Sequence, residues 1–131
     1  MKKRLTAGIL SLSIMTTAWA QTGTANPLLQ NWTGPYGGIP PFDKVQIVHF
    51  KPAMEAAMAA QLAEVEKIAA NPQAPTFDNT LAAMEAAGKT LSRVQTVYGI
   101  WSSTMNSKDF QAVEKELAPK LAAHQDKITQ N

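Results

Sequence analysis

Apolar residues recur at helical spacing along three segments of this chain. In the first, residues 48–70, they step by three and four positions, which predicts a helix with one buried face. Pro52 is acceptable in its first turn, where backbone donors have no intrahelical partner, and Asn71-Pro72 ends it because proline disfavours helical geometry in the preceding residue. The stripe consists of Phe50, Met54, Ala57, Gln61, Val65 and Ile68, widened by Ala53, Met58, Leu62 and Ala69.

A second stripe follows the tight connection at residues 72–75. Thr76 is a suitable N-cap, and Asp78 favours the positive end of the helix dipole. Gly88 lies on the stripe at a cost of about 1 kcal/mol relative to alanine, and we interpret it as a close helix–helix contact more than as a break. The stripe, which predicts one helix as far as a turn at residues 102–107, is Phe77, Leu81, Met84, Gly88, Leu91, Val94, Tyr98 and Trp101.

The third stripe predicts a helix that Asn106 or Ser107 caps, with Asp109 in its first turn. Pro119 falls inside the helix and should bend it by removing one backbone hydrogen bond. The stripe is Phe110, Val113, Leu117, Leu121, His124 and Ile128.

A Pro- and Gly-rich arm precedes the helices. Residues 26–41 contain four prolines and three glycines, which excludes a helix and disfavours a strand. Trp32 and Tyr36 favour an arm that orders by laying its aromatic residues on a neighbouring surface; a flexible tail is the alternative.

Together these patterns predict an all-α protein with three long helices and short connections, which favours antiparallel neighbours. The expected organisation is a signal peptide (1–20), an extended arm (21–47) and a helical region (48–131).

The first twenty residues have the features of a secretory signal. Lys2, Lys3 and Arg4 precede a short apolar core at residues 5–15, and Ala18-Trp19-Ala20 supplies small residues for cleavage before Gln21. An uncleaved membrane anchor is the alternative, but the apolar run is shorter than the roughly 20 residues that span a bilayer. We therefore expect an exported, periplasmic protein with no membrane anchor after cleavage.

Charge and cysteine content exclude several functions. The formal charge is +2, but removal of the three basic signal residues leaves 9 of the 12 basic side chains against 10 acidic ones. The basic character thus belongs to the signal, and nucleic-acid binding is not expected. The chain has no cysteine, which excludes thiol catalysis and cysteine metal sites and fits bacterial export.

Residues that could carry chemistry are few. His49 and His124 are the two histidines, and no His-Glu-x-x-His arrangement occurs. We expect His49 to be structural at a helix start and His124 to be packed on its stripe. Met54, Met58 and Met84 lie at core spacing.

The remaining candidates do not form a recognisable site. The pairs Glu64/Glu66 and Glu114/Glu116 are each two residues apart and point to different faces of a helix, so we interpret them as solvated surface. The serines at positions 102, 103 and 107 lie in a turn without a nucleophile elbow, and Gly37-Gly38 precedes prolines and cannot open a phosphate-binding helix. We therefore assign no catalytic, cofactor-binding or metal-ligating residue.

Several motifs, in this order and spacing, resemble the thimet-oligopeptidase family of zinc peptidases. The likeness is greatest to the amino-terminal portion of its bacterial peptidyl-dipeptidases, also called dipeptidyl carboxypeptidases. The motifs are Asn26-Pro27-Leu28-Leu29, Gly38-Ile39-Pro40-Pro41-Phe42-Asp43-Lys44, His49-Phe50-Lys51-Pro52-Ala53, Asn71-Pro72, Pro75-Thr76-Phe77-Asp78-Asn79-Thr80 with Glu85, Ala118-Pro119-Lys120-Leu121-Ala122-Ala123-His124, and residues 126–131.

The resemblance implies a large helical enzyme that releases dipeptides from the carboxyl end of short peptides. Its single zinc is held by a His-Glu-x-x-His helix and a further glutamate, and its amino-terminal helices help to wall a channel for unfolded peptides. None of those zinc or substrate residues matches a position in 1–131, so this chain alone is expected to bind no zinc, to be inactive and to lack the carboxy-terminal body of the enzyme.

The alternative is a free-standing periplasmic helical binding module. Good capping and periodicity favour it, but Trp32, Tyr36, Trp101 and Phe110 need partners that three helices alone seldom supply. Cooperative unfolding without dye-binding apolar surface would favour the module, and a molten, aggregating product would favour the fragment.

Overall fold

The computed structural model describes residues 25–130, and within this range the protein is helical. The all-α class is confirmed, and the one β pairing among these residues is an isolated bridge between Thr33 and Ile39. The expected signal peptide, residues 1–20, lies outside the described residues. The elements are the 3₁₀ turns η1 (Pro27–Leu29) and η2 (Pro35–Gly37), α1 (Ile47–Ala69), the π-helical turn η3 (Phe77–Ala82), α2 (Ala83–Ala86), α3 (Lys89–Thr104) and α4 (Lys108–Thr129).

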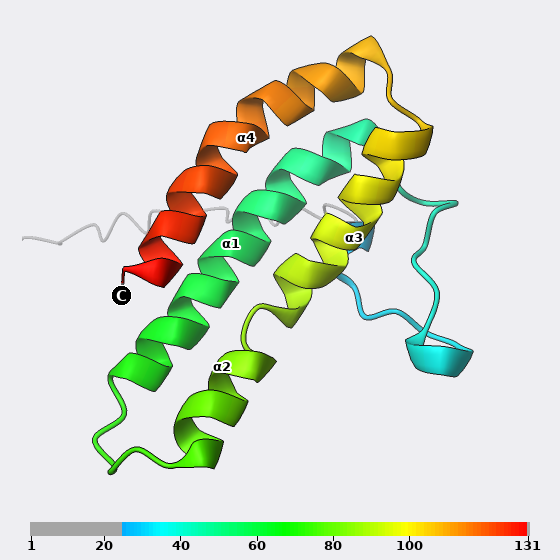
Figure 1. Ribbon diagram of the computed structural model, residues 1–131. Coiled ribbons are helices and arrows are strands. Elements are labelled where there is room, and N and C mark those ends of the chain that lie inside the picture. Colours follow the sequence, from blue (N-terminus) through cyan, green and yellow to red (C-terminus); the bar gives the residue numbers. More distant parts are fainter. Residues whose placement is uncertain (1–24, 131) are drawn as a thin grey trace, which may run out of the picture.

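Helix α1 lies at the centre of the molecule. Figure 1 shows α4 along one side of it, and α3 and α2 end to end along the other. Phe50 of α1 contacts Trp101, whereas Glu64, further along α1, contacts Gly88. Because the partner's residue number falls as that of α1 rises, the α2–α3 segment runs antiparallel to α1. Lys51 of α1 contacts Glu116 of α4, and Gln61 of α1 contacts His124 of α4. Because both residue numbers rise together, α1 and α4 run parallel.

The start of α1 is fixed by a reciprocal cap. The His49 backbone N–H donates to the Gln46 carbonyl at 2.9 Å, while the Gln46 backbone N–H donates to His49 Nδ1 at 3.0 Å. Such a capping box satisfies two helix-end donors at once. Pro52 lies inside the helix as expected, and the predicted end near Asn71-Pro72 is confirmed.

The expected single second helix is wrong at Gly88. This residue is left-handed (φ +78°) and separates α2 from α3. The other half of the interpretation is confirmed, because Gly88 is buried against α1 and its N–H donates to Glu64 Oε2 at 2.7 Å. A Cβ at position 88 would lie 2.3 Å from Gln61 Nε2. Only glycine combines this φ with this close approach.

The other helix ends differ from prediction in detail. The second helical segment begins at Thr76 as expected, but its first six residues are π-helical. Ser102 and Ser103 belong to α3 instead of a turn, which is confined to residues 105–107. Ser107 caps α4 by accepting from the Phe110 N–H at 3.2 Å. Helix α4 continues through Pro119, and the expected bend there stays a prediction.

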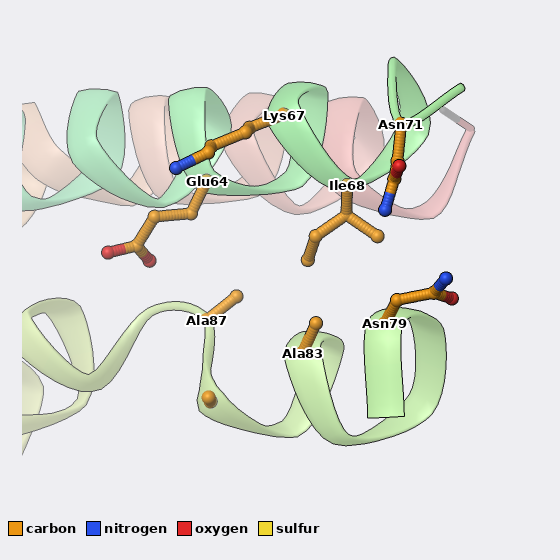
Figure 2. A pocket seen from close by; sticks show the side chains of 8 residues that line it. Glu64, Lys67, Ile68, Asn71, Asn79, Ala83 and Ala87 are labelled. Carbon is orange, nitrogen blue, oxygen red and sulfur yellow. The ribbon is translucent and has the colours of Figure 1, made fainter. Parts of the chain in front are cut away.

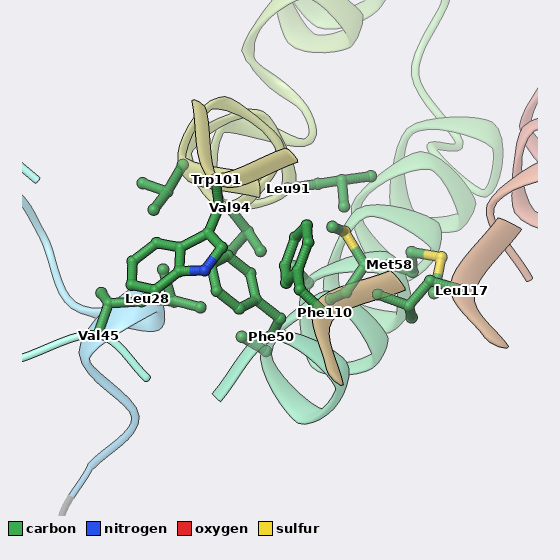
Figure 3. Packing of buried hydrophobic residues seen from close by; sticks show 13 residues of the cluster. Leu28, Val45, Phe50, Met58, Leu91, Val94, Trp101, Phe110 and Leu117 are labelled. Atoms are coloured by element: carbon green, nitrogen blue, oxygen red, sulfur yellow. The ribbon is translucent and has the colours of Figure 1, made fainter. Parts of the chain in front are cut away.

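The core lies toward the amino-terminal end of α1, where all three long helices meet (Figure 3). Phe50 is fully buried, and its ring centroid lies 5.2 Å from that of Trp101 and 5.1 Å from that of Phe110, both edge-to-face. Such pairs add about 0.5–1.5 kcal/mol each beyond the area they bury. The other buried members include Leu28, Val45, Met54, Met58, Leu91, Val94, Val97 and Leu117.

The first turn of the arm, η1, lies on α1 and α3. Leu28 of η1 is 1% exposed, and Asn26 Nδ2 donates to the His49 carbonyl at 2.9 Å. Trp32 packs against the core as expected, but Tyr36 does not, since its side chain is fully exposed. Leu28, in place of Tyr36, is the residue that anchors the arm.

Within residues 25–130, no helix combines the length and the apolar character needed to cross a bilayer.

Two glycine substitutions should change stability in opposite directions. Gly88→Ala should lower the free energy of unfolding by about 2 kcal/mol, because alanine is strained at this φ and its Cβ would displace Gln61. Gly99→Ala, in α3 with nothing near the added Cβ, should raise it by roughly 0.5–1 kcal/mol. Urea unfolding of both variants measures the difference, and equal shifts would contradict the constraint at Gly88.

Candidate functional site

An open hollow lies between the carboxy-terminal half of α1 and the η3–α2 segment (Figure 2). Ile68 and Asn71 point from the α1 side toward Ala83 and Asn79 on the other. The remaining lining residues are Glu64, Lys67, Ala86 and Ala87. Its walls are therefore alanine and isoleucine, with polar side chains at the rim.

Three polar side chains of this hollow, Glu64, Asn71 and Asn79, already bind backbone groups of the chain. Asn79 accepts from the Thr76 N–H at 2.8 Å and donates to the Ala74 carbonyl at 2.9 Å, which completes the cap of η3. Glu64 accepts from the Gly88 N–H, and Asn71 accepts from the Gln73 N–H at 3.0 Å. These groups are structural, so the hollow offers shape and apolar surface more than reactive chemistry.

The two histidines are both structural, in agreement with the sequence interpretation. His49 completes the capping box of α1 through Nδ1. His124 of α4 is half-buried, and its Nε2 lies 2.7 Å from Gln61 Oε1. Burial, and then the nearby Lys127 charge, lower the pKa of His124 below its usual value of 6.5.

These histidines do not fit a shared zinc site. His49 and Gln61, the partner of His124, are twelve residues apart on α1, which corresponds to a rise of about 18 Å. Zinc ligands lie about 2 Å from the metal. Among residues 25–130, no three His, Cys, Asp or Glu side chains come together as a possible metal site.

The acidic residues of α4 lie at or near the surface, Glu116 exposed as expected and Glu114 partly buried, and both also connect helices. Glu114 accepts from the Ser102 hydroxyl of α3 and, at 3.5 Å, from Asn106 Nδ2. Glu116 pairs with Lys51 of α1, and this contact lowers the pKa of Glu116 and raises that of Lys51.

A second ion pair joins Lys120 of α4 to Glu55 of α1, one helical turn beyond the Lys51–Glu116 pair. Both pairs are well exposed, and solvent screening leaves such pairs with little net contribution to stability. They bridge α1 and α4 at the surface. Glu66 is exposed, in agreement with its surface interpretation.

The three serines also have structural partners. Ser102 binds Glu114, Ser103 donates to the Gly99 carbonyl at 2.9 Å, and Ser107 caps α4. None of the three hydroxyls contacts a histidine. The assignment of no catalytic, cofactor-binding or metal-ligating residue stays a prediction.

The feature that sequence reasoning missed is an outward apolar stripe. Phe77, Leu81 and Met84 were expected on a buried stripe, Met84 at core spacing, but their exposed fractions are 70%, 62% and 39%. The signal that could have revealed it is the alanine-rich opposite face, which includes Ala83 and Ala87. We call Phe77, Leu81 and Met84 the η3–α2 stripe.

Known proteins resemble this chain over most of its length. The dipeptidyl carboxypeptidase of Escherichia coli (strain K12) is 35% identical over 99 residues, which are 76% of this chain and 14% of that protein. The dipeptidyl carboxypeptidase of Salmonella typhimurium is 33% identical over 108 residues, which are 82% of this chain and 16% of that protein. No profile of a known protein family matches the chain.

These similarities are to a peptidase, and they support the dipeptidyl carboxypeptidase resemblance that the motifs indicated. The chain spans about one seventh of the length of the curated relatives it matches. Membership of the wider thimet-oligopeptidase family stays a prediction. So does the position of this chain at the amino terminus of such an enzyme.

The stability of the protein should depend on His124 under mildly acidic conditions. Because the folded state lowers the pKa of His124, the unfolded state binds the proton more readily. The contribution of neutral His124 to the free energy of unfolding is complete above about pH 6.5. It is lost as the pH falls through the lower pKa that His124 has in the folded state. His124→Gln keeps a polar partner for Gln61 but cannot titrate. Its urea midpoint should therefore fall less than that of the wild type between about pH 7.5 and about pH 5.5, and equal decreases would contradict this role.

Proposed function

We propose that this chain is the amino-terminal segment of an exported, zinc-dependent dipeptidyl carboxypeptidase. The observation that carries the proposal is the similarity of 33–35% identity over about four fifths of the chain to proteins of that name. The enzyme would release dipeptides from the carboxyl end of short peptides. This segment would supply helical scaffold, while the catalytic and substrate-binding groups would lie in the rest of the enzyme.

The chemistry of the chain is consistent with a scaffolding role. In the proposed enzyme, zinc would polarise the scissile carbonyl and activate water. The two histidines of this chain are committed to a helix cap and to Gln61. We therefore assign them no part in binding the metal or the peptide.

Export to a bacterial periplasm belongs to the same proposal. It is supported by the basic, apolar and small-residue segments of residues 1–20 and by the absence of cysteine from the sequence. After cleavage before Gln21 the chain would carry no membrane anchor, and its near-neutral charge does not favour nucleic acid.

A free-standing helical binding module is the second candidate. The observation that favours it is the closed aromatic core, in which Phe50 and Phe110 are fully buried and Trp101 is 8% exposed. Those aromatic side chains do not require a larger body. The two candidates differ in whether the chain can replace its counterpart inside a working peptidase.

The chain alone should release no dipeptide from short peptides, with or without added zinc. The expected result follows from the absence of a His-Glu-x-x-His motif in its sequence. Peptide cleavage assayed by mass spectrometry, together with a zinc titration by calorimetry, tests it. Stoichiometric zinc binding with chelator-sensitive dipeptide release would overturn the assignment.

A chimera should test the place of the segment in the enzyme. The matched segment of the Escherichia coli relative is replaced by the corresponding segment of this chain. Dipeptide release should stay within about tenfold of the parent, a loss of no more than about 1.4 kcal/mol of transition-state stabilisation.

Deletion of the matched segment without replacement serves as the control and should abolish activity. A chimera as inactive as the deletion would favour the free-standing module.

A further inference from the structure

The η3–α2 stripe is a single outward face. Phe77 and Leu81, four residues apart, border one open surface depression with Glu85 and Lys89. Met84 follows three residues after Leu81 and is 39% exposed. Scattered exposed apolar residues are ordinary, whereas adjacent large ones on one face indicate an interaction surface.

This helical segment turns the opposite face toward its neighbour from the one that an amphipathic helix usually buries. Its small face, with Ala83 and Ala87, lies toward α1 (Figure 2), while the three large apolar side chains point to solvent. Rotation of the segment would bury the large side chains instead. The structure therefore places them outward, away from the hollow whose α1 side is lined by Glu64, Lys67, Ile68 and Asn71.

Polar contacts define both ends of this segment, and the one at its end reaches α1. At the start, the Thr76 hydroxyl accepts from the Asn79 N–H at 3.1 Å and Asn79 caps Thr76 in return. At the end, Glu64 binds the Gly88 N–H. The segment also opens with a π-helical turn, a rare geometry that often marks functional sites. The presentation of the stripe is thus built into the local structure.

The surroundings of the stripe fit a protein partner. Glu85 and Lys89 at its border carry opposite charges, and an apolar centre with a mixed polar rim is typical of protein–protein interfaces. A nucleic acid or an anionic membrane would require a basic surround.

The length of the relatives favours one partner for the stripe. About six sevenths of each curated relative lies outside the part that this chain matches. A body connected in the same polypeptide acts at an effective concentration on the order of millimolar. The connected body would therefore bind the η3–α2 stripe in preference to a second copy of the chain.

We propose that the η3–α2 stripe docks onto an apolar surface of the peptidase body and joins this helical layer to it. The inference rests on the proposed function and adds to it the side chains through which the segment is attached.

The test compares Leu81→Glu with Val48→Glu, in the chimera described above and in the isolated chain. Val48 is a matched control, because it is 70% exposed and lies in the first turn of α1, away from the stripe.

In the chimera, Leu81→Glu should lower the melting temperature by about 3 °C or more, while Val48→Glu should leave it unchanged. In the isolated chain, both variants should keep the helical circular dichroism and the melting temperature of the wild type. Leu81→Ala is the milder variant if Leu81→Glu prevents the chimera from folding.

Each outcome has a separate meaning. Equal melting temperatures for the two glutamate variants of an active chimera would overturn the docking role and leave the proposed function standing. Sedimentation of the isolated chain as a dimer that Leu81→Glu dissociates would overturn it in favour of a second copy. An inactive wild-type chimera would overturn the proposed function, and the docking inference with it.

Discussion

The left-handed turn at Gly88 is the constraint on which the rest of this structure depends. Its N–H is held by Glu64, and its missing Cβ leaves room for Gln61, so α1 approaches it as it could approach no other residue. The turn changes the helical phase between α2 and α3. After it, Leu91 and Val94 face the core; before it, the large apolar side chains face solvent. One backbone conformation therefore determines both the closed core and the exposed stripe.

Helix α1 transmits this constraint to the other side of the molecule. Gln61 lies beside Gly88 on one side and binds His124 of α4 on the other, so a change at the turn reaches α4 through one side chain. Toward its amino-terminal end α1 is held by an aromatic cluster around Phe50, whereas toward its carboxy-terminal end its partners are polar or small. Because apolar burial is the main source of stability, local opening should begin at the Gly88 end.

Much of the fold could be predicted from periodicity and capping, and the exceptions have physical causes. The limits of α1, the cap at Ser107 and the structural role of His49 followed from local rules that the structure obeys. The break at Gly88 could not be predicted, because helical spacing continues across it and its partners Glu64 and Gln61 come from another helix. The exposure of Tyr36 was missed because its residue type was weighed above its place in the Pro35–Gly37 turn, where it has a left-handed φ of 59°. The hollow and the stripe depend on how α2 is rotated against α1, which is a tertiary property.

The two proposed roles of the chain, peptidase segment and independent module, do not differ in whether the chain can fold. Trp101 and Phe110, which the sequence left in need of a partner, are buried by α1 within the chain itself. A cooperative unfolding transition would therefore be expected of either role. A binding module could use the capped helical segment that turns Phe77 and Leu81 toward water as readily as a peptidase segment could. The uncovered part of this structure is the η3–α2 stripe, so the two roles differ in what covers it: the rest of the same polypeptide or a separate partner.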